Sequence, residues 1–183
     1  CSPDFGIKGV LDRFGQIKPK ILFTTNGHLF KGKSIDSLER IADIISKLPS
    51  IEKIVVVPYT EQDPDISKVP NAVHYDDFKS SESNLEIAFE QLPFSHPLYI
   101  MYSSGTTGLP KIVPRTYNNL MVTNKCISRA LDETDRMLQA TPVGHAMAMQ
   151  GSVNCALYRG ATLILQRIPR PREIMETIEK EKV

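Results

Sequence analysis

Residues 21–57 alternate between a short apolar run, an amphipathic stretch and a second apolar run. The apolar runs, residues 21–25 and 54–57, consist mainly of Ile, Leu, Phe and Val and predict two buried strands. Residues 35–48 carry apolar side chains at helical spacing and end at Pro49, which predicts a helix. A strand, a helix and a strand within about forty residues make a βαβ unit, whose strands run parallel.

The rest of the chain continues this alternation, with a helix expected before the unit as well. Thr116 is expected to cap one helix, and Gly160 to end another. We expect strands at 72–75, 98–102, 112–114, 136–141 and 162–165, and helices at 4–16, 117–131, 146–158 and 172–182. The pattern predicts an α/β fold, with a mostly parallel sheet flanked by helices.

Composition excludes several classes of partner. The net charge of +1 leaves no electrostatic footprint for nucleic acid, and no apolar run approaches the ~20 residues that a membrane-spanning helix needs. The three cysteines, at 1, 126 and 155, are too few and too widely spaced for a disulfide framework or a zinc site. We therefore expect reduced, buried thiols in a cytoplasmic protein, whose oligomeric state the sequence leaves open.

The densest candidate chemistry lies between Ser103 and Lys111. This segment of nine residues contains two glycines, four hydroxyls and a lysine. Glycine lets the backbone turn its N–H groups toward an anion, hydroxyls add donors, and the lysine supplies positive charge. The candidate phosphate-binding residues are Ser103, Ser104, Gly105, Thr106, Thr107, Gly108 and Lys111. An ordinary solvated turn is the alternative, since the order of residues matches neither G-x-x-x-x-G-K-[ST] nor G-x-G-x-x-G.

The same nine residues match, at every position, the S-S/T-G-T-T-G-x-P-K loop of the adenylate-forming enzymes, and the chain is identified as a member of that superfamily. The resemblance implies that a carboxylate attacks the α-phosphate of ATP and that a thiol then displaces AMP. It implies ATP, Mg²⁺ and coenzyme A as cofactors, with Mg²⁺ ligands outside this chain. It also implies that the loop holds the β- and γ-phosphates and that Lys111 is catalytic, neutralising the charge on departing pyrophosphate.

The two halves of the chain resemble different branches of the superfamily. Residues 1–111 resemble the acetoacetyl-CoA synthetases, most clearly over residues 89–102 before the loop. Residues 112–183 resemble the aryl-acid AMP ligases, through Pro114-Arg115-Thr116-Tyr117 and residues 141–145. A chimera and a divergent natural member both remain open. The first branch favours an acid–CoA ligase acting on acetoacetate. The alternatives are an aryl-acid ligase of the 2,3-dihydroxybenzoate type that loads a carrier protein, and a non-catalytic nucleotide-binding domain.

His145 is the candidate substrate-binding residue. It resembles the histidine or aromatic residue that follows a proline-containing turn near the acyl pocket in the superfamily. The alternative is a surface or helix-capping histidine. The chain lacks the superfamily's Y-G-x-T-E segment and its late lysine. The resemblance therefore implies that residues 1–183 are a fragment of the AMP-binding N-terminal domain, without the C-terminal domain, and do not complete adenylation alone.

Overall fold

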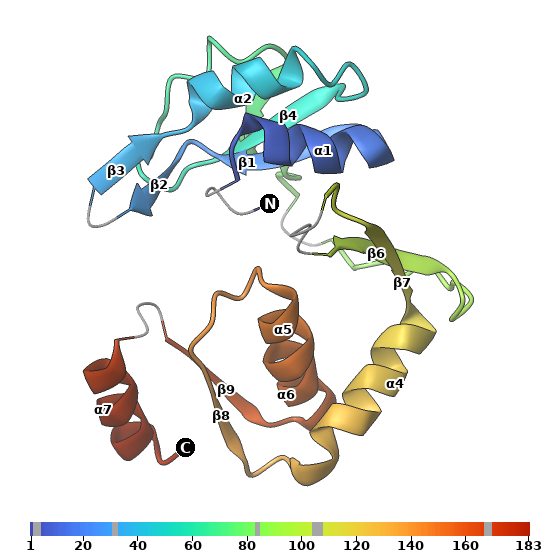
Figure 1. Cartoon of the computed structure of the whole chain (residues 1–183), viewed down its shortest axis with the longest axis vertical. Coiled ribbons are helices and arrows are strands. Elements are labelled where there is room, and N and C mark those ends of the chain that lie inside the picture. The colour runs from blue at the N-terminus through green and yellow to red at the C-terminus, as the bar shows by residue number, and fades with distance from the viewer. Residues whose placement is uncertain (2–4, 31–32, 83–84, 104–107, 167–169) are drawn as a thin grey trace. The chain divides into compact units, whose positions relative to one another are not determined.

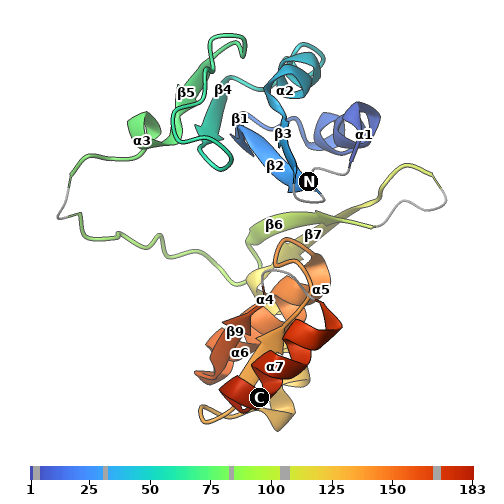
Figure 2. The same cartoon turned by 90° about the vertical axis from the view of Figure 1, so that its left-hand side faces the viewer.

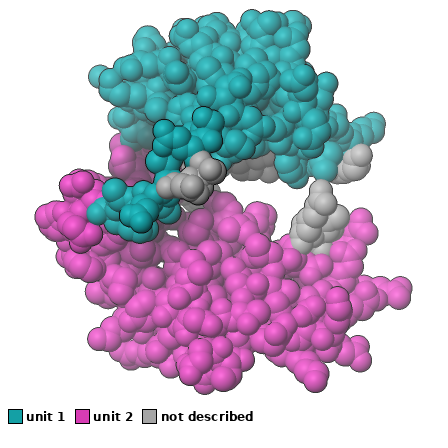
Figure 3. Space-filling view, turned by 180° about the vertical axis from the view of Figure 1, so that it is seen from behind, with its two compact units in different colours: residues 1–89, 106–110 teal, residues 90–105, 111–183 magenta. Residues whose placement is uncertain are grey.

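The computed structural model describes residues 1, 5–30, 33–82, 85–103, 108–166 and 170–183. The chain divides into two compact units, coloured separately in Figure 3. Unit 1 contains residues 1–89 and 106–110, and unit 2 contains residues 90–105 and 111–183. Each unit is described by itself.

Unit 1 is built on a three-stranded parallel sheet. Its strands lie in the order β1-β4-β5, with Ile21 opposite Lys53 and Ile54 opposite Ala72. The elements are α1 (Ile7–Ile17), β1 (Ile21–Thr25), β2 (Gly27–Phe30), β3 (Lys33–Asp36), α2 (Leu38–Ile45), β4 (Lys53–Val57), β5 (Ala72–His74) and α3 (Tyr75–Phe78). The predicted βαβ unit is therefore present, and its two strands pair in parallel.

The core of unit 1 forms where α2 packs against β4. Ile54, Val55 and Val56 are fully buried, as a central strand covered by helices requires. The buried side chains of α2 that form a cluster with Ile54 and Val56 are Leu38, Ile41, Ile44 and Ile45. Helix α1 packs its apolar face against the same cluster, and Figures 1 and 2 show α1 and α2 side by side next to the sheet.

The helix predicted at 35–48 is shorter than expected. Residues 33–36 form strand β3, which pairs antiparallel with β2, so that Ile35 lies opposite His28 in a hairpin. The Asp36 carboxylate accepts a hydrogen bond from the Leu38 N–H at 2.7 Å, which marks the helix start. Strand pairing with a neighbour overrides the helical spacing of Ile35, which sequence periodicity alone could not show.

Unit 2 contains two pairs of strands and the remaining described helices. Strands β6 (Pro97–Tyr102) and β7 (Ile112–Thr116) form an antiparallel hairpin, and β8 (Arg136–Gln139) and β9 (Thr162–Leu165) pair in parallel. The other elements are α4 (Tyr117–Ile127), a 3₁₀ turn (Ser128–Ala130), α5 (Ala146–Ala148), a π-helical turn (Met149–Val153), α6 (Asn154–Arg159) and α7 (Pro171–Glu181). The predicted α/β fold class is confirmed.

Two helix ends in unit 2 follow their sequence signals. The Thr116 hydroxyl accepts from the Asn119 N–H at 3.3 Å, while the Asn119 side chain accepts from the Thr116 N–H at 3.1 Å, which makes a reciprocal cap. Gly160 ends α6 with a φ of 74°, a left-handed conformation that glycine adopts without steric cost. At the far end of the unit, Arg136 of β8 pairs with Glu181 of α7 at 2.7 Å.

Strand β6 and the cysteines differ from expectation. The apolar run at 98–102 predicts a buried strand, but Ile100 is 44% exposed, and among the described strands β6 pairs with β7 alone. The expectation of buried thiols is wrong for Cys1 and Cys126, which are exposed, and right for Cys155, which is buried. All three thiols are free.

Thiol reactivity should separate the three cysteines. Burial raises the pKa of the Cys155 thiol, so it carries less thiolate than an exposed cysteine at the same pH. We expect Ellman's reagent at pH 8 to label two thiols quickly in the native protein and the third only after denaturation. A Cys155→Ser variant should keep the two fast thiols and lose the slow one. Three fast thiols in the native protein would contradict the burial of Cys155.

Candidate functional site

The candidate phosphate loop is the connection of a β-hairpin. Strand β6 ends at Tyr102 and β7 begins at Ile112, so the loop spans the nine residues between them. Ser104, Gly105, Thr106 and Thr107 lie outside the described residues. Ser103, Gly108 and Lys111 are described, and they define the two ends of the loop.

Two hydrogen bonds in unit 2 close the base of the loop. The Ser103 N–H donates to the Lys111 carbonyl at 3.0 Å, and the Lys111 N–H donates to the Ser103 Oγ at 3.0 Å. Ser103 therefore has a structural role as an acceptor, and its hydroxyl hydrogen remains available for another acceptor. Lys111 is exposed, and among the described carboxylates none forms an ion pair with its ammonium group.

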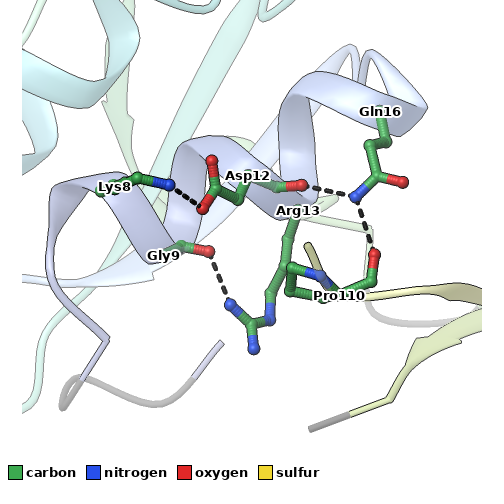
Figure 4. A network of polar contacts seen from close by, with 6 residues as sticks. All are labelled: Lys8, Gly9, Asp12, Arg13, Gln16 and Pro110. Atoms are coloured by element: carbon green, nitrogen blue, oxygen red, sulfur yellow. Dashed lines mark hydrogen bonds and ion pairs between the residues drawn. The ribbon is translucent and has the colours of Figure 1, made fainter. Parts of the chain in front are cut away.

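The far end of the loop needs glycine for its backbone conformation. Gly108 has a φ of 149°, which side chains other than glycine rarely adopt. A Cβ placed on Gly108 would meet no atom within 4 Å, so space does not exclude a side chain there. Two residues on, the buried Pro110 directs its carbonyl oxygen to the Gln16 side chain of α1 at 3.0 Å, within unit 1 (Figure 4).

The hairpin setting determines which groups could bind an anion. In loops that lead into a helix, the helix N-terminus supplies free N–H groups and a positive dipole end. Here the loop leads into strand β7, which offers neither. An anion at this loop would therefore depend on the N–H groups of the loop itself, on the hydroxyls and on the Lys111 charge.

His145 caps the helix that follows it. Its Nδ1 accepts a hydrogen bond from the Met147 N–H at 3.3 Å, and the side chain is exposed. The capping geometry predicted as the alternative is present. A neutral ring that accepts at Nδ1 carries its proton on Nε2, so this atom can still donate to a ligand. The apolar run at 146–158 predicts core positions for Met147 and Met149, but they are 70% and 39% exposed.

Sequence reasoning missed two glutamines beside these segments. Gln16 contacts Pro110 across 94 residues of sequence. In unit 2, the Gln150 amide lies 3.3 Å from the Tyr99 hydroxyl and 3.3 Å from the Met101 sulfur, which links the π-helical turn to β6. No local pattern marks either glutamine, since their partners lie far away in the sequence. π-Helical turns are often found at functional sites.

Other kinds of site receive little support. Within the described part of the chain, no cluster of three or more His, Cys, Asp or Glu side chains could hold a metal ion. None of the described helices combines the length and apolar composition that a bilayer-spanning segment needs. Unit 1 has an apolar pocket of about 390 Å³ between α1, α2 and β1, but none of the described loop residues lines it.

Comparison with known proteins identifies similar sequences. The family model described as AMP-binding enzyme matches residues 1–183. An acetoacetyl-CoA synthetase of Gallus gallus is 36% identical over 98% of this chain, and one of Danio rerio is 45% identical over 66% of it. The chain spans 28% and 19% of the length of these relatives. The first alignment runs past residue 111, so similarity to these synthetases extends into the second half.

Two solved structures are similar to the chain. The acetoacetyl-CoA synthetase from Streptomyces lividans has a TM-score of 0.73 and 31% identity, and the match covers 90% of this chain and 25% of the other. The apo structure of MbtA from Mycobacterium smegmatis also has a TM-score of 0.73, at 18% identity, over 100% of this chain and 32% of the other. At that identity the second match shows the fold alone.

Gly108 and Gly151, two of the glycines with open space around them, should respond differently to an added methyl group. Gly108→Ala forces a side chain into a positive φ, so we expect it to lower the free energy of unfolding by about 1 to 2 kcal/mol. Gly151→Ala is the matched control, since its Cβ also meets nothing within 4 Å but its φ is not positive. The Gly151→Ala variant should have an unchanged free energy of unfolding or one higher by up to about 1 kcal/mol. Urea unfolding measures both, and equal effects would contradict a backbone requirement at Gly108.

Proposed function

The chain belongs to the AMP-binding enzyme family, and on that premise we propose that the complete protein is an ATP-dependent acid–CoA ligase that activates acetoacetate. The observation that carries this proposal is the 36% identity to an acetoacetyl-CoA synthetase across 98% of the chain. The structural similarity to the Streptomyces lividans enzyme supports it. The free thiols are consistent with the cytoplasmic location that we also propose.

Residues 1–183 are, in this proposal, part of the AMP-binding N-terminal domain. The chain spans about a quarter of the length of the similar synthetases, which leaves room for a C-terminal domain outside it. The two compact units are then parts of one larger domain. Within the described residues, the chain offers the two ends of the candidate phosphate loop and a candidate acyl-side histidine, but no cluster of metal ligands.

The first step of the reaction forms the adenylate. A carboxylate oxygen of the acid attacks the α-phosphorus of ATP, and the bond from that phosphorus to the bridging oxygen breaks, so that pyrophosphate leaves with the electron pair. Lys111 and the loop N–H groups stabilise the negative charge that grows on the pyrophosphate. Mg²⁺ would neutralise further phosphate charge when bound with ATP.

The second step transfers the acyl group to coenzyme A. The thiol releases its proton to solvent, and its sulfur attacks the carbonyl carbon of the adenylate. The bond from that carbon to the phosphate oxygen breaks, so that AMP leaves and a thioester remains. We propose that His145, with the Nε2 proton that its capping geometry leaves free, donates a hydrogen bond to the acid in the acyl pocket. Its Nδ1 stays occupied by the Met147 N–H, which fixes the direction of the ring.

Replacing the loop lysine tests its proposed charge role. In the complete protein, Lys111→Ala should reduce the rate of acid-dependent ATP–pyrophosphate exchange by about a hundredfold or more, the loss typical of removing one preorganised donor. Lys111→Arg should retain part of the activity because it keeps the charge. Lys125→Ala, an exposed lysine of α4 in the same unit, is the control and should exchange at the wild-type rate. Wild-type exchange by Lys111→Ala would contradict the assignment.

A panel of acids tests the substrate. We expect the complete protein to catalyse ATP–pyrophosphate exchange with acetoacetate and not with benzoate-type acids, whereas the chain of residues 1–183 alone should show no exchange. Preference for 2,3-dihydroxybenzoate would instead identify a ligase that loads a carrier protein. ATP binding without exchange for any acid would identify a non-catalytic nucleotide-binding domain.

A further inference from the structure

We propose that Gln16 is a positioning residue for the candidate phosphate loop, because its side-chain amide holds the carbonyl of Pro110, the residue that precedes Lys111. The inference rests on the proposed function of the loop. It adds a contribution from α1, an element that the loop motif does not include and that lies at the other end of the sequence.

The geometry comes from one side chain with two hydrogen bonds. Gln16 lies in the last turn of α1, and its Nε2 donates to the Pro110 carbonyl at 3.0 Å and to the Asp12 carbonyl at 2.5 Å (Figure 4). A primary amide has two N–H groups, so both are used. The bond to Asp12 keeps the side chain along its own helix and points the second N–H at Pro110.

The Pro110 carbonyl needs such a donor. Pro110 is buried, and a buried carbonyl without a partner loses its hydration without compensation. Gln16 supplies the partner from within the same compact unit. The loop conformation that turns this carbonyl toward α1 is therefore stabilised over conformations that leave it unpaired.

Holding this carbonyl also constrains the next residue. The peptide group between Pro110 and Lys111 is planar, so the direction of its C=O determines the direction of its N–H. The proline ring removes most of the freedom on the other side, since φ of Pro110 is restricted. The Lys111 N–H donates to Ser103 Oγ at the base of the loop. One bond from Gln16 thus acts on the backbone that carries the proposed catalytic ammonium group.

Helix α1 is a firm support for this contact. Val10, Leu11 and Phe14 pack against the core cluster of unit 1. On another side of the helix, the Arg13 guanidinium donates to the Gly9 carbonyl at 2.7 Å and lies 3.9 Å from the centre of the Phe5 ring. A side chain on a helix held in this way can define a position to a fraction of an ångström, as a positioning residue requires.

Three variants in the complete protein test the inference. Gln16→Met keeps the length and removes the donor, Gln16→Lys keeps a donor, and Lys8→Met is the control. Lys8 is on the same helix, and its exposed ion pair with Asp12 does not touch Pro110. For Gln16→Met we expect the KM for ATP in pyrophosphate exchange to rise about tenfold, equivalent to about 1.4 kcal/mol, with the KM for the acid unchanged. The other two variants should stay within about twofold of wild type.

Hydrogen exchange supplies a readout that does not depend on activity. Amides of residues 103–111 should exchange faster in Gln16→Met than in wild type, at an unchanged melting temperature, and Gln16→Lys should restore the wild-type rate. The inference would be overturned if Gln16→Met kept the wild-type hydrogen-exchange rate of the loop and the wild-type KM for ATP. It would also be overturned if Gln16→Met and Gln16→Lys changed these two quantities equally. Absence of pyrophosphate exchange in the wild type would count against the proposed function alone, and the hydrogen-exchange comparison would still decide the role of Gln16.

Discussion

The packing of α2 on β4 is the interaction on which unit 1 depends. Ile54, Val55 and Val56 have no contact with solvent, and burial of such side chains is the main favourable term in folding. This core fixes the parallel pairing of β1 with β4 and gives α1 a surface to pack on. Helix α1 in turn carries Gln16 to Pro110. The contact between Gln16 and Pro110 therefore depends on the core that forms around β4.

The candidate loop differs from phosphate loops that open a helix. It joins the two strands of a hairpin, and its ends are tied by the pair of hydrogen bonds between Ser103 and Lys111. Because no helix N-terminus follows, the loop must provide its own donors and charge. Gly108, near the end of the loop, has a positive φ that residues with a side chain rarely adopt, while the space around it is open.

The acyl side of the proposed site has a comparable support in unit 2. Strand β6 leads into the loop, and its Tyr99 and Met101, which lie on one face two residues apart, receive the Gln150 amide from the π-helical turn. This turn follows closely after His145, the capping residue of α5. The strand before the candidate phosphate loop and the segment after the candidate acyl histidine are therefore joined through the Gln150 side chain.

Local patterns in the sequence determined most elements and their ends. Some elements depend only on residues a few positions apart, whose spacing and backbone preferences can be recognised in the sequence. These are strand β1 at 21–25, strand β9 at 162–165, the Thr116 cap and the helix end at Gly160. The loop motif likewise indicated the family, because its nine residues are contiguous. Tertiary structure alone decided that Ile35 joins a hairpin, that Ile100 of β6 is exposed and that Gln16 reaches Pro110. These outcomes depend on partners distant in sequence, and only folding the chain brings such partners within hydrogen-bonding or packing distance.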